Sequence, residues 1–139
     1  MATTVCDVRL TDAPLALSTE IPPAETGAIV DFWGVVRATE NGTAIAGIEY
    51  EAHHAMAKHQ LRRVADECLQ EFELNQLIVH HRTGFVAVGE ASLLVRVGSR
   101  HRAAAFRASA WIVDELKTRV PIWKHPVAIR AVASAALPQ

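Results

Sequence analysis

Two lysines near the end of the chain are the first candidates for chemistry. Lys117 lies at the end of a predicted helix, and Lys124 follows it beyond a proline, in the segment LKTRVPIWK. A lysine that is desolvated beside other cations has a lowered pKa and can act as an acid, a base or a nucleophile. A purely structural role is the alternative for Lys117, because a cation is favourable at the C-terminal end of a helix.

A second group of cations lies between a predicted strand and the start of the same helix. The run GSRHR at 98–102 places His101 and Arg102 at a helix N-terminus, where free backbone N–H groups attract anions. Arginine adds a bidentate fork that suits phosphate or carboxylate. Cations in the first turn oppose the helix dipole, so stability alone would favour acids there. The run indicates an anion-binding cradle, with a tolerated surface cluster as the alternative.

Other candidates are an arginine and several histidines. Arg37 ends an apolar strand just before a turn, where site residues are common, although an ordinary surface arginine fits the same position. His80 and His81 are adjacent on a predicted strand and therefore point to opposite faces. His54 and His59 are five residues apart, which is not the i, i+4 spacing of a helical ligand pair. We expect no metal site.

Composition and charge distribution indicate what kind of ligand the chain binds. The chain has 139 residues, of which 50% are hydrophobic, and a net charge of −1, which is typical of a folded protein and unlike a basic nucleic-acid binder. Residues 96–130 nevertheless carry a net charge of +6 and the remainder −7. This local positive field favours a small anionic ligand, with solvated surface charge as the alternative.

Several features predict a cytoplasmic location. No apolar run approaches the roughly 20 residues of a membrane span, and the N-terminus lacks the pattern of a signal peptide. Cys6 and Cys68 are far apart and lie outside any metal-ligand spacing, so we expect reduced thiols, with Cys68 a core residue.

Strands and helices at regular intervals are expected to position these residues. The expected strands are 27–37, 44–52, 77–82, 90–97 and 122–131. The expected helices are 54–72 and 102–119, the second of which ends because Pro121 cannot continue it. Asn41-Gly42 predicts a hairpin turn that pairs the first two strands at the centre of a sheet. The pattern predicts an α+β fold, with two helices on a mainly antiparallel sheet and a single domain over 1–139.

Four segments, read in order, resemble the large, catalytic subunit of molybdopterin synthase, the MoaE family. They are GAIVDFWGVVR (27–37), IEYEAHHAMA (48–57), VHHRTGFVAVGEASLLVRVGSRHRAAAF (79–106) and DELKTRVPIWK (114–124). The resemblance covers about residues 27–125 and implies a fold of the α/β-hammerhead type.

The resemblance implies a sulfur transfer. Such proteins install a dithiolene on cyclic pyranopterin monophosphate, which makes molybdopterin. The sulfur arrives as a thiocarboxylate on the C-terminal Gly-Gly of a small ubiquitin-like subunit, which agrees with the lack of a catalytic cysteine here. Two large subunits form a homodimer with one small subunit at each end. No cofactor, nucleic acid or membrane is implied.

The resemblance also implies roles for individual residues. Lys117 would be the principal catalytic lysine, and Lys124 a second one that contacts the substrate and the incoming tail. The implied substrate-binding residues are Val35, Val36, Arg37, His101, Arg102, Lys117, Lys124, His125 and Pro126. The neighbouring protomer can contribute some of them. His125-Pro126 stand where the family commonly has a basic residue and a glutamate, which leaves open a catalytically inactive or divergent paralogue that acts as a small-anion-binding or scaffold dimer.

Overall fold

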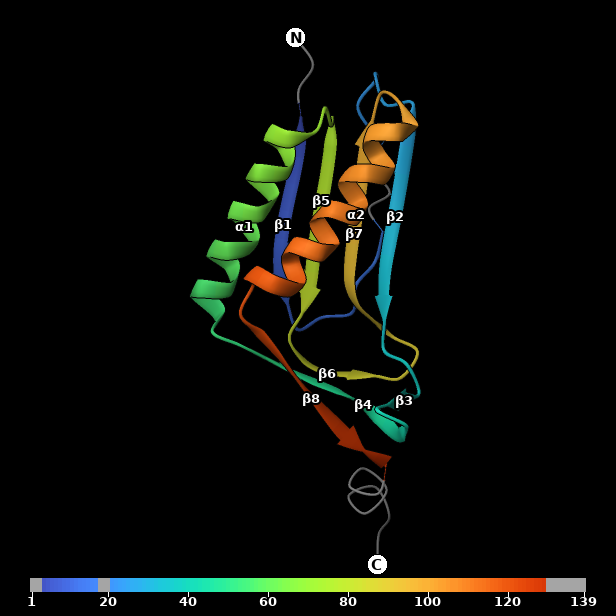
Figure 1. Cartoon of the computed structure of the whole chain (residues 1–139), viewed down its shortest axis with the longest axis vertical. Coiled ribbons are helices and arrows are strands. Elements are labelled where there is room, and N and C mark those ends of the chain that lie inside the picture. The colour runs from blue at the N-terminus through green and yellow to red at the C-terminus, as the bar shows by residue number, and fades with distance from the viewer. Residues whose placement is uncertain (1–3, 18–20, 130–139) are drawn as a thin grey trace, which may run out of the picture.

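The structure is a computed structural model that describes residues 4–17 and 21–129 (Figure 1). Its helices are α1 (His54–Glu71) and α2 (Arg102–Arg119). Its strands are β1 (Val5–Thr11), β2 (Ala28–Val35), β3 (Thr39–Glu40), β4 (Thr43–Ala52), β5 (Gln76–Arg82), β6 (Gly84–Ala87), β7 (Ala91–Ser99) and β8 (Ile122–Ala128). Two helices on a mostly antiparallel mixed sheet make an α+β fold, as predicted.

The larger sheet has the strand order β1-β5-β7-β2. The pairs β5–β7 and β7–β2 are antiparallel, whereas β1 runs parallel to β5. Both helices cover the same face of this sheet (Figure 1). Strand β2 is the edge strand next to β7, and α2 packs over both of these strands.

The main core lies between the helices and this sheet. Alternation along β7 turns Leu93, Val95 and Val97 toward the helices. Helix α1 buries positions spaced by three and four residues, including Leu61 and Cys68. Burial raises the pKa of the Cys68 thiol to about 12, so this cysteine is an inert core residue, as predicted.

The smaller sheet is built on β4, which pairs antiparallel with β3, β6 and β8. It lies at one end of the molecule, beyond the C-terminal end of α2 (Figure 1). Asn41 and Gly42 both have positive φ, 51° and 77°, as a tight β3–β4 turn requires. The core of the smaller sheet consists of Val36, Ile45, Ile48, Tyr50 and Val86.

The prediction that the first two strands pair with each other is wrong. Strand β2 pairs with β7 at the edge of the larger sheet, while β4 belongs to the smaller one. A register shift at Gly34/Val35 disturbs the β2–β7 ladder, and the chain then leaves that sheet. Asn41-Gly42 does form a hairpin turn, but the strand before it is only Thr39–Glu40.

The other predicted elements are confirmed to within two residues at each end, apart from the C-terminal limit of the last strand. The expected end of that strand at 131 lies outside the described residues. Three strands were not predicted. Strand β1 precedes the first predicted strand, β3 has only two residues before the hairpin turn, and β6 occupies only four residues of the Gly84–Gly89 connection.

Gly47 on β4 should be intolerant of any side chain. A Cβ there would lie 2.4 Å from the Val86 carbonyl oxygen and 2.6 Å from the Phe85 ring. We therefore expect Gly47→Ala to destabilise the protein by about 1–3 kcal/mol, as overpacking typically does, measured by urea unfolding. Glu49→Ala, at an exposed position of the same strand, is the control. Equal stability of the two variants would contradict this expectation, because it would show that β4 and β6 can move apart to admit a methyl group without loss of stability.

Candidate functional site

A cavity of about 630 Å³ lies where the two sheets meet the C-terminal end of α2. Every layer of the fold contributes to it, including both sheets and both helices. The lining residues are Phe32, Trp33, Gly34, Val35, Val36, Arg37, Glu40, Ile48, Tyr50, Leu61, His81, Ser92, Leu93, Leu116, Lys117, Val120, Ile122 and Lys124. Apolar walls with a few convergent polar groups are typical of a small-molecule site.

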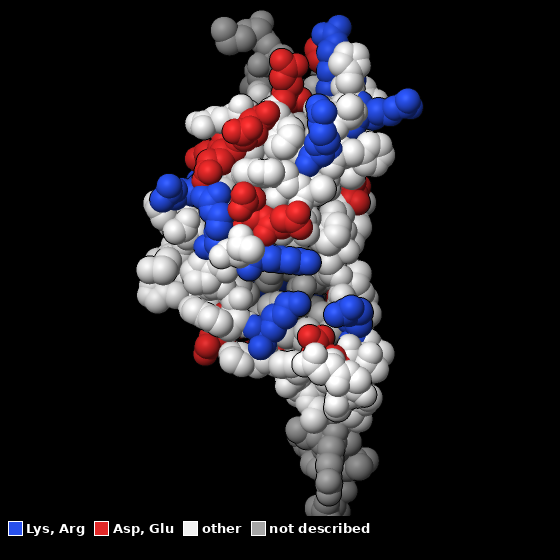
Figure 2. Space-filling model, in the orientation of Figure 1, with Lys and Arg blue, Asp and Glu red and all other residues white. Residues whose placement is uncertain are grey.

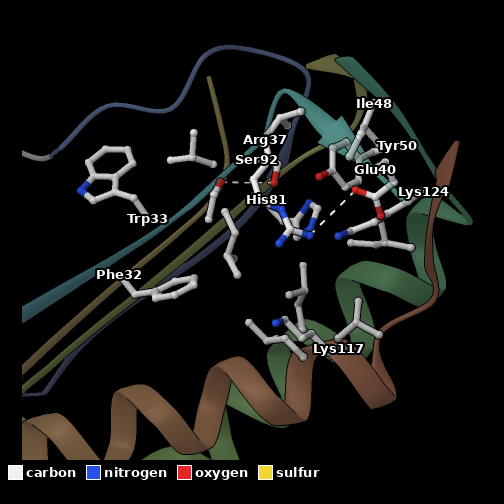
Figure 3. Close-up of a pocket in the computed structure, with 18 residues that line it drawn as sticks. Phe32, Trp33, Arg37, Glu40, Ile48, Tyr50, His81, Ser92, Lys117 and Lys124 are labelled. Atoms are coloured by element: carbon white, nitrogen blue, oxygen red, sulfur yellow. Dashed lines mark hydrogen bonds and ion pairs between the residues drawn. The ribbon is translucent and has the colours of Figure 1, made fainter. Parts of the chain in front are cut away.

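Three cations come to this cavity from three separate segments. Lys117 enters from the last turns of α2, Lys124 from β8, and Arg37 from the connection after β2 (Figure 3). Arg37 is held only loosely, because its Nη2 lies 4.0 Å from Glu40 Oε2 and its side chain is 81% exposed. The predicted candidates Arg37, Lys117 and Lys124 therefore share one cavity. Lys117 and Lys124 form no ion pair with any residue in 4–17 or 21–129, which suits them to bind an anion.

The chain reaches the cavity at Val35 and Val36 because of the register shift that ends β2. Val36 is buried in the core of the smaller sheet, and its N–H donates to the Glu90 carbonyl. Val35 is half exposed and lines the cavity. Both residues were candidates from the sequence, and their place here follows from the change of sheet.

His81 is a cavity residue that sequence reasoning did not identify. Its Nδ1 lies 2.7 Å from the Arg82 carbonyl oxygen, and its ring packs edge-on against Tyr50 at 5.4 Å between centroids. Burial lowers the pKa of His81, the nearby Lys124 charge lowers it further, and the backbone hydrogen bond opposes both effects. The ring is therefore neutral at pH 7.

The alternation of the strand could have found this residue. His80 points to the other face of β5, as predicted, and its Nε2 lies 2.9 Å from Asp7 Oδ2. Because His80 and His81 are neighbours on β5, they point to opposite faces, and one of them had to face the helices or the second sheet. Tyr50 and Ser92 were missed for another reason, because nothing in the sequence showed which strands would converge.

His101 and Arg102 do not reach the cavity within this chain. They lie at the N-terminal end of α2, and the 15 helical steps from Arg102 to Lys117 span roughly 22 Å. Figure 2 shows Lys and Arg side chains gathered near both ends of α2, with acidic and uncharged side chains between them. Both residues are exposed, and the N-terminal end of α2 has no side-chain cap. The expectation that they join the lysines fails for a single copy, because one straight helix separates the two groups.

His125 and Pro126 also lie outside the cavity. They follow Lys124 on β8, pair with Glu49 and Ile48 of β4, and are exposed. His125 Nε2 lies 3.4 Å from Glu51 Oε1. Because neighbouring residues of a strand point to opposite faces, Lys124 faces inward and His125 does not. A part for these two residues in substrate binding therefore stays a prediction.

An ion pair fixes the helix end that carries Lys117. Arg119 of α2 binds Glu67 of α1 through both guanidinium nitrogens, with Nη1 3.2 Å from Oε1. The hydrogen bond from Arg119 lowers the pKa of Glu67 below its ordinary value of 4.5, with burial opposing this effect. The pair joins the two helices beside the cavity.

This pair should make stability depend on pH. A carboxylate with a lowered pKa stabilises the fold above pH 4.5, and this contribution is lost as the pH falls through the lowered value. We expect Glu67→Gln to lower the Tm at pH 7, and to lower it by less at pH 3, below the ordinary pKa of 4.5. Asp66→Asn, which breaks the exposed Arg62–Asp66 pair, is the control. A Tm difference that is the same at both pH values would contradict this.

The fold and the cavity define an α+β protein with a cation-lined cavity between two sheets, of a kind that suits a small anionic ligand. The family model described as MoaE protein matches residues 10–119, and the chain belongs to this family. The α/β-hammerhead type was expected from the resemblance to this family, and it stays a prediction.

Individual relatives support the assignment. The molybdopterin synthase catalytic subunit of Pyrococcus abyssi is 42% identical over 107 residues, which cover 77% of this chain and 72% of the relative. That of Thermoplasma volcanium is 38% identical over 114 residues, covering 82% and 83%. A crystal structure of molybdopterin synthase from Staphylococcus aureus superimposes with a TM-score of 0.72 at 32% identity, covering 76% and 77%. Among the described residues, no helix is long and apolar enough to cross a membrane.

Proposed function

We propose that this chain is the catalytic subunit of a molybdopterin synthase. It transfers sulfur from the thiocarboxylated C-terminus of a small ubiquitin-like subunit to cyclic pyranopterin monophosphate, and the product is the molybdopterin dithiolene. The observation that carries the proposal is the convergence of Lys117, Lys124 and Arg37 on one cavity in a member of the MoaE family. The cyclic phosphate of the substrate needs cations, and the sulfur carrier removes the need for a cysteine.

Lys117 is the catalytic lysine in this proposal. Its side chain enters the cavity from α2, where an ammonium group can donate a proton or stabilise the charge that develops as sulfur adds to the substrate. Lys124 contacts the substrate and the tail of the small subunit. Arg37 offers a fork for the phosphate, since the one ion pair it makes with a described residue is the long one to Glu40.

His101 and Arg102 act, in this proposal, on the cavity of a second copy. Strand β2 is an edge strand, and α2 packs beside it. A two-fold axis at this edge, perpendicular to the strands, sets the two α2 helices antiparallel, so that the N-terminus of one approaches the C-terminus of the other. The two cationic groups lie roughly 22 Å apart within one chain. In the antiparallel arrangement, His101 and Arg102 of one copy therefore lie beside Lys117 and Lys124 of the other.

A cytoplasmic location belongs to the same proposal. Cys6 and Cys68 are both free thiols, which is usual where the compartment is reducing.

The direct test combines the purified chain, the thiocarboxylated small subunit and cyclic pyranopterin monophosphate. We expect a dithiolene product, detected after oxidation to its fluorescent pterin derivative, and a small subunit that ends in an ordinary carboxylate. The small subunit with an unmodified C-terminus is the control. Binding of both components without any product would favour an inactive scaffold instead.

A further inference from the structure

One histidine of the cavity is held as a neutral base. A carbonyl oxygen only accepts hydrogen bonds, so the 2.7 Å contact with the Arg82 carbonyl places the ring hydrogen of His81 on Nδ1. The lone pair of the neutral ring is then on Nε2, which has no hydrogen-bond partner among the described residues. Tyr50 fixes the plane of the ring from the side. A fixed tautomer with a free nitrogen is the arrangement of a general base and its orienting group.

The other polar groups of the cavity are poorer bases. Lysine and arginine side chains carry only donors when charged. Burial raises the pKa of Tyr50, which keeps its phenol protonated, although a hydrogen bond to Ser92 opposes the shift. Glu40 lies beside the guanidinium of Arg37, and a carboxylate is in general a weaker base than an imidazole.

The proposed sulfur transfer needs such a base. The thiocarboxylate sulfur bonds to a substrate carbon as an oxygen substituent leaves that carbon with the bonding electron pair. Because the sulfur is still attached to the carbonyl carbon of the small subunit, the result is a thioester. Release of that sulfur requires water. A new C–O bond forms at the carbonyl carbon, the C–S bond breaks, and the products are a carboxylic acid and a thiol, with nothing oxidised or reduced.

We propose that His81 is the proton acceptor for this hydrolysis. Nε2 takes a proton from the attacking water as its oxygen bonds to the carbonyl carbon. The imidazolium then returns the proton to the departing sulfur. This inference rests on the proposed function, and Figure 3 shows His81 inside the cavity, among the cations from the other segments.

The pH dependence follows from the surroundings of His81. The charged or titratable groups that line the cavity with it are Arg37, Glu40, Tyr50, Lys117 and Lys124. Burial and the Lys124 charge lower the pKa of the ring, so Nε2 stays free down to a pH below 6.5. Hydrolysis by wild type should therefore be constant through pH 7 and fall only on the acid side of 6.5.

The test is a single-turnover reaction of the full chain with thiocarboxylated small subunit and cyclic pyranopterin monophosphate, followed by mass spectrometry. We expect His81→Asn to slow product release about 100-fold and to accumulate the thioester between small subunit and substrate. His81→Gly should regain activity when imidazole is added, with a dependence on pH that follows free imidazole. His80→Asn, on the opposite face of the same strand, is the matched control and should keep the wild-type rate.

Several results would overturn the inference without touching the proposed function. One is a His81→Asn variant that releases product at the wild-type rate. Another is slow turnover with no thioester and no imidazole rescue, which would assign His81 to binding or packing. Loss of the base activity in Glu40→Gln instead would assign the role to Glu40. If the variants fail to fold, a wild-type hydrolysis rate with no fall below pH 6.5 overturns it. Wild type that makes no dithiolene refutes the proposed function itself.

Discussion

Replacing Lys117 by alanine is expected to lower sulfur transfer by at least about 100-fold, the usual contribution of a positioned proton donor. The reason is its position, because it is the cation that α2 delivers to the cavity, next to the apolar wall formed by Leu116 and Val120. No other cavity-lining lysine or arginine comes from this helix. The measurement is the rate of dithiolene formation at saturating substrate and small subunit.

The same variant should keep its fold. Lys117 is exposed and makes no ion pair with another described residue, so its loss should change the free energy of unfolding by no more than about 0.5 kcal/mol. Binding of the small subunit should persist, as measured by calorimetry. Arg107→Ala removes an exposed cation of α2 outside the cavity and is the matched control. A Lys117→Ala enzyme with the parent rate would remove this lysine from the mechanism.

Arg102→Ala is expected to weaken binding of cyclic pyranopterin monophosphate by about 10- to 100-fold, the loss of one hydrogen bond to a charged group. The side chain is exposed at the uncapped N-terminal end of α2, where free N–H groups add to the attraction for a phosphate. Affinity for the small subunit should stay the same, because in the proposed site its tail is contacted by Lys124 and not by Arg102.

Calorimetry with each binding partner in turn checks the effect of Arg102. Arg107→Ala again serves as the control, since it removes the same charge about one turn further along the helix. An unchanged substrate affinity in Arg102→Ala would show that the N-terminal end of α2 is ordinary charged surface.

Local patterns predicted the elements well. Helix α2 was predicted at 102–119, where Pro121 stops it. Its apolar residues at steps of three and four face the core, namely Ala105, Ala108, Ile112 and Leu116. The Asn41-Gly42 turn was predicted because its positive φ angles are a local property. The sheet to which each strand belongs is not a local property. Strands β2 and β4 are separated by a short hairpin, yet a bulge sends them to different sheets.

The site was predictable in part for the same reason. Lys117, Lys124 and Arg37 stood out by charge at the ends of elements, and all three line the cavity. His81 carries no such signal, because its role depends on a carbonyl contact and on strands that meet only in three dimensions. His101 and Arg102 were expected at the same site, although one helix holds them apart from Lys117 within a chain.

Mixing two variants that are impaired in different ways shows whether each site takes its cations from two copies of the chain. Lys117→Ala and Arg102→Ala homodimers are unfolded together, refolded and assayed with subsaturating substrate. If Arg102 serves the partner's cavity, half of the dimers are mixed and each contains one intact site, so about a quarter of the wild-type activity returns. Activity no higher than the average of the two separate variants would contradict the shared site.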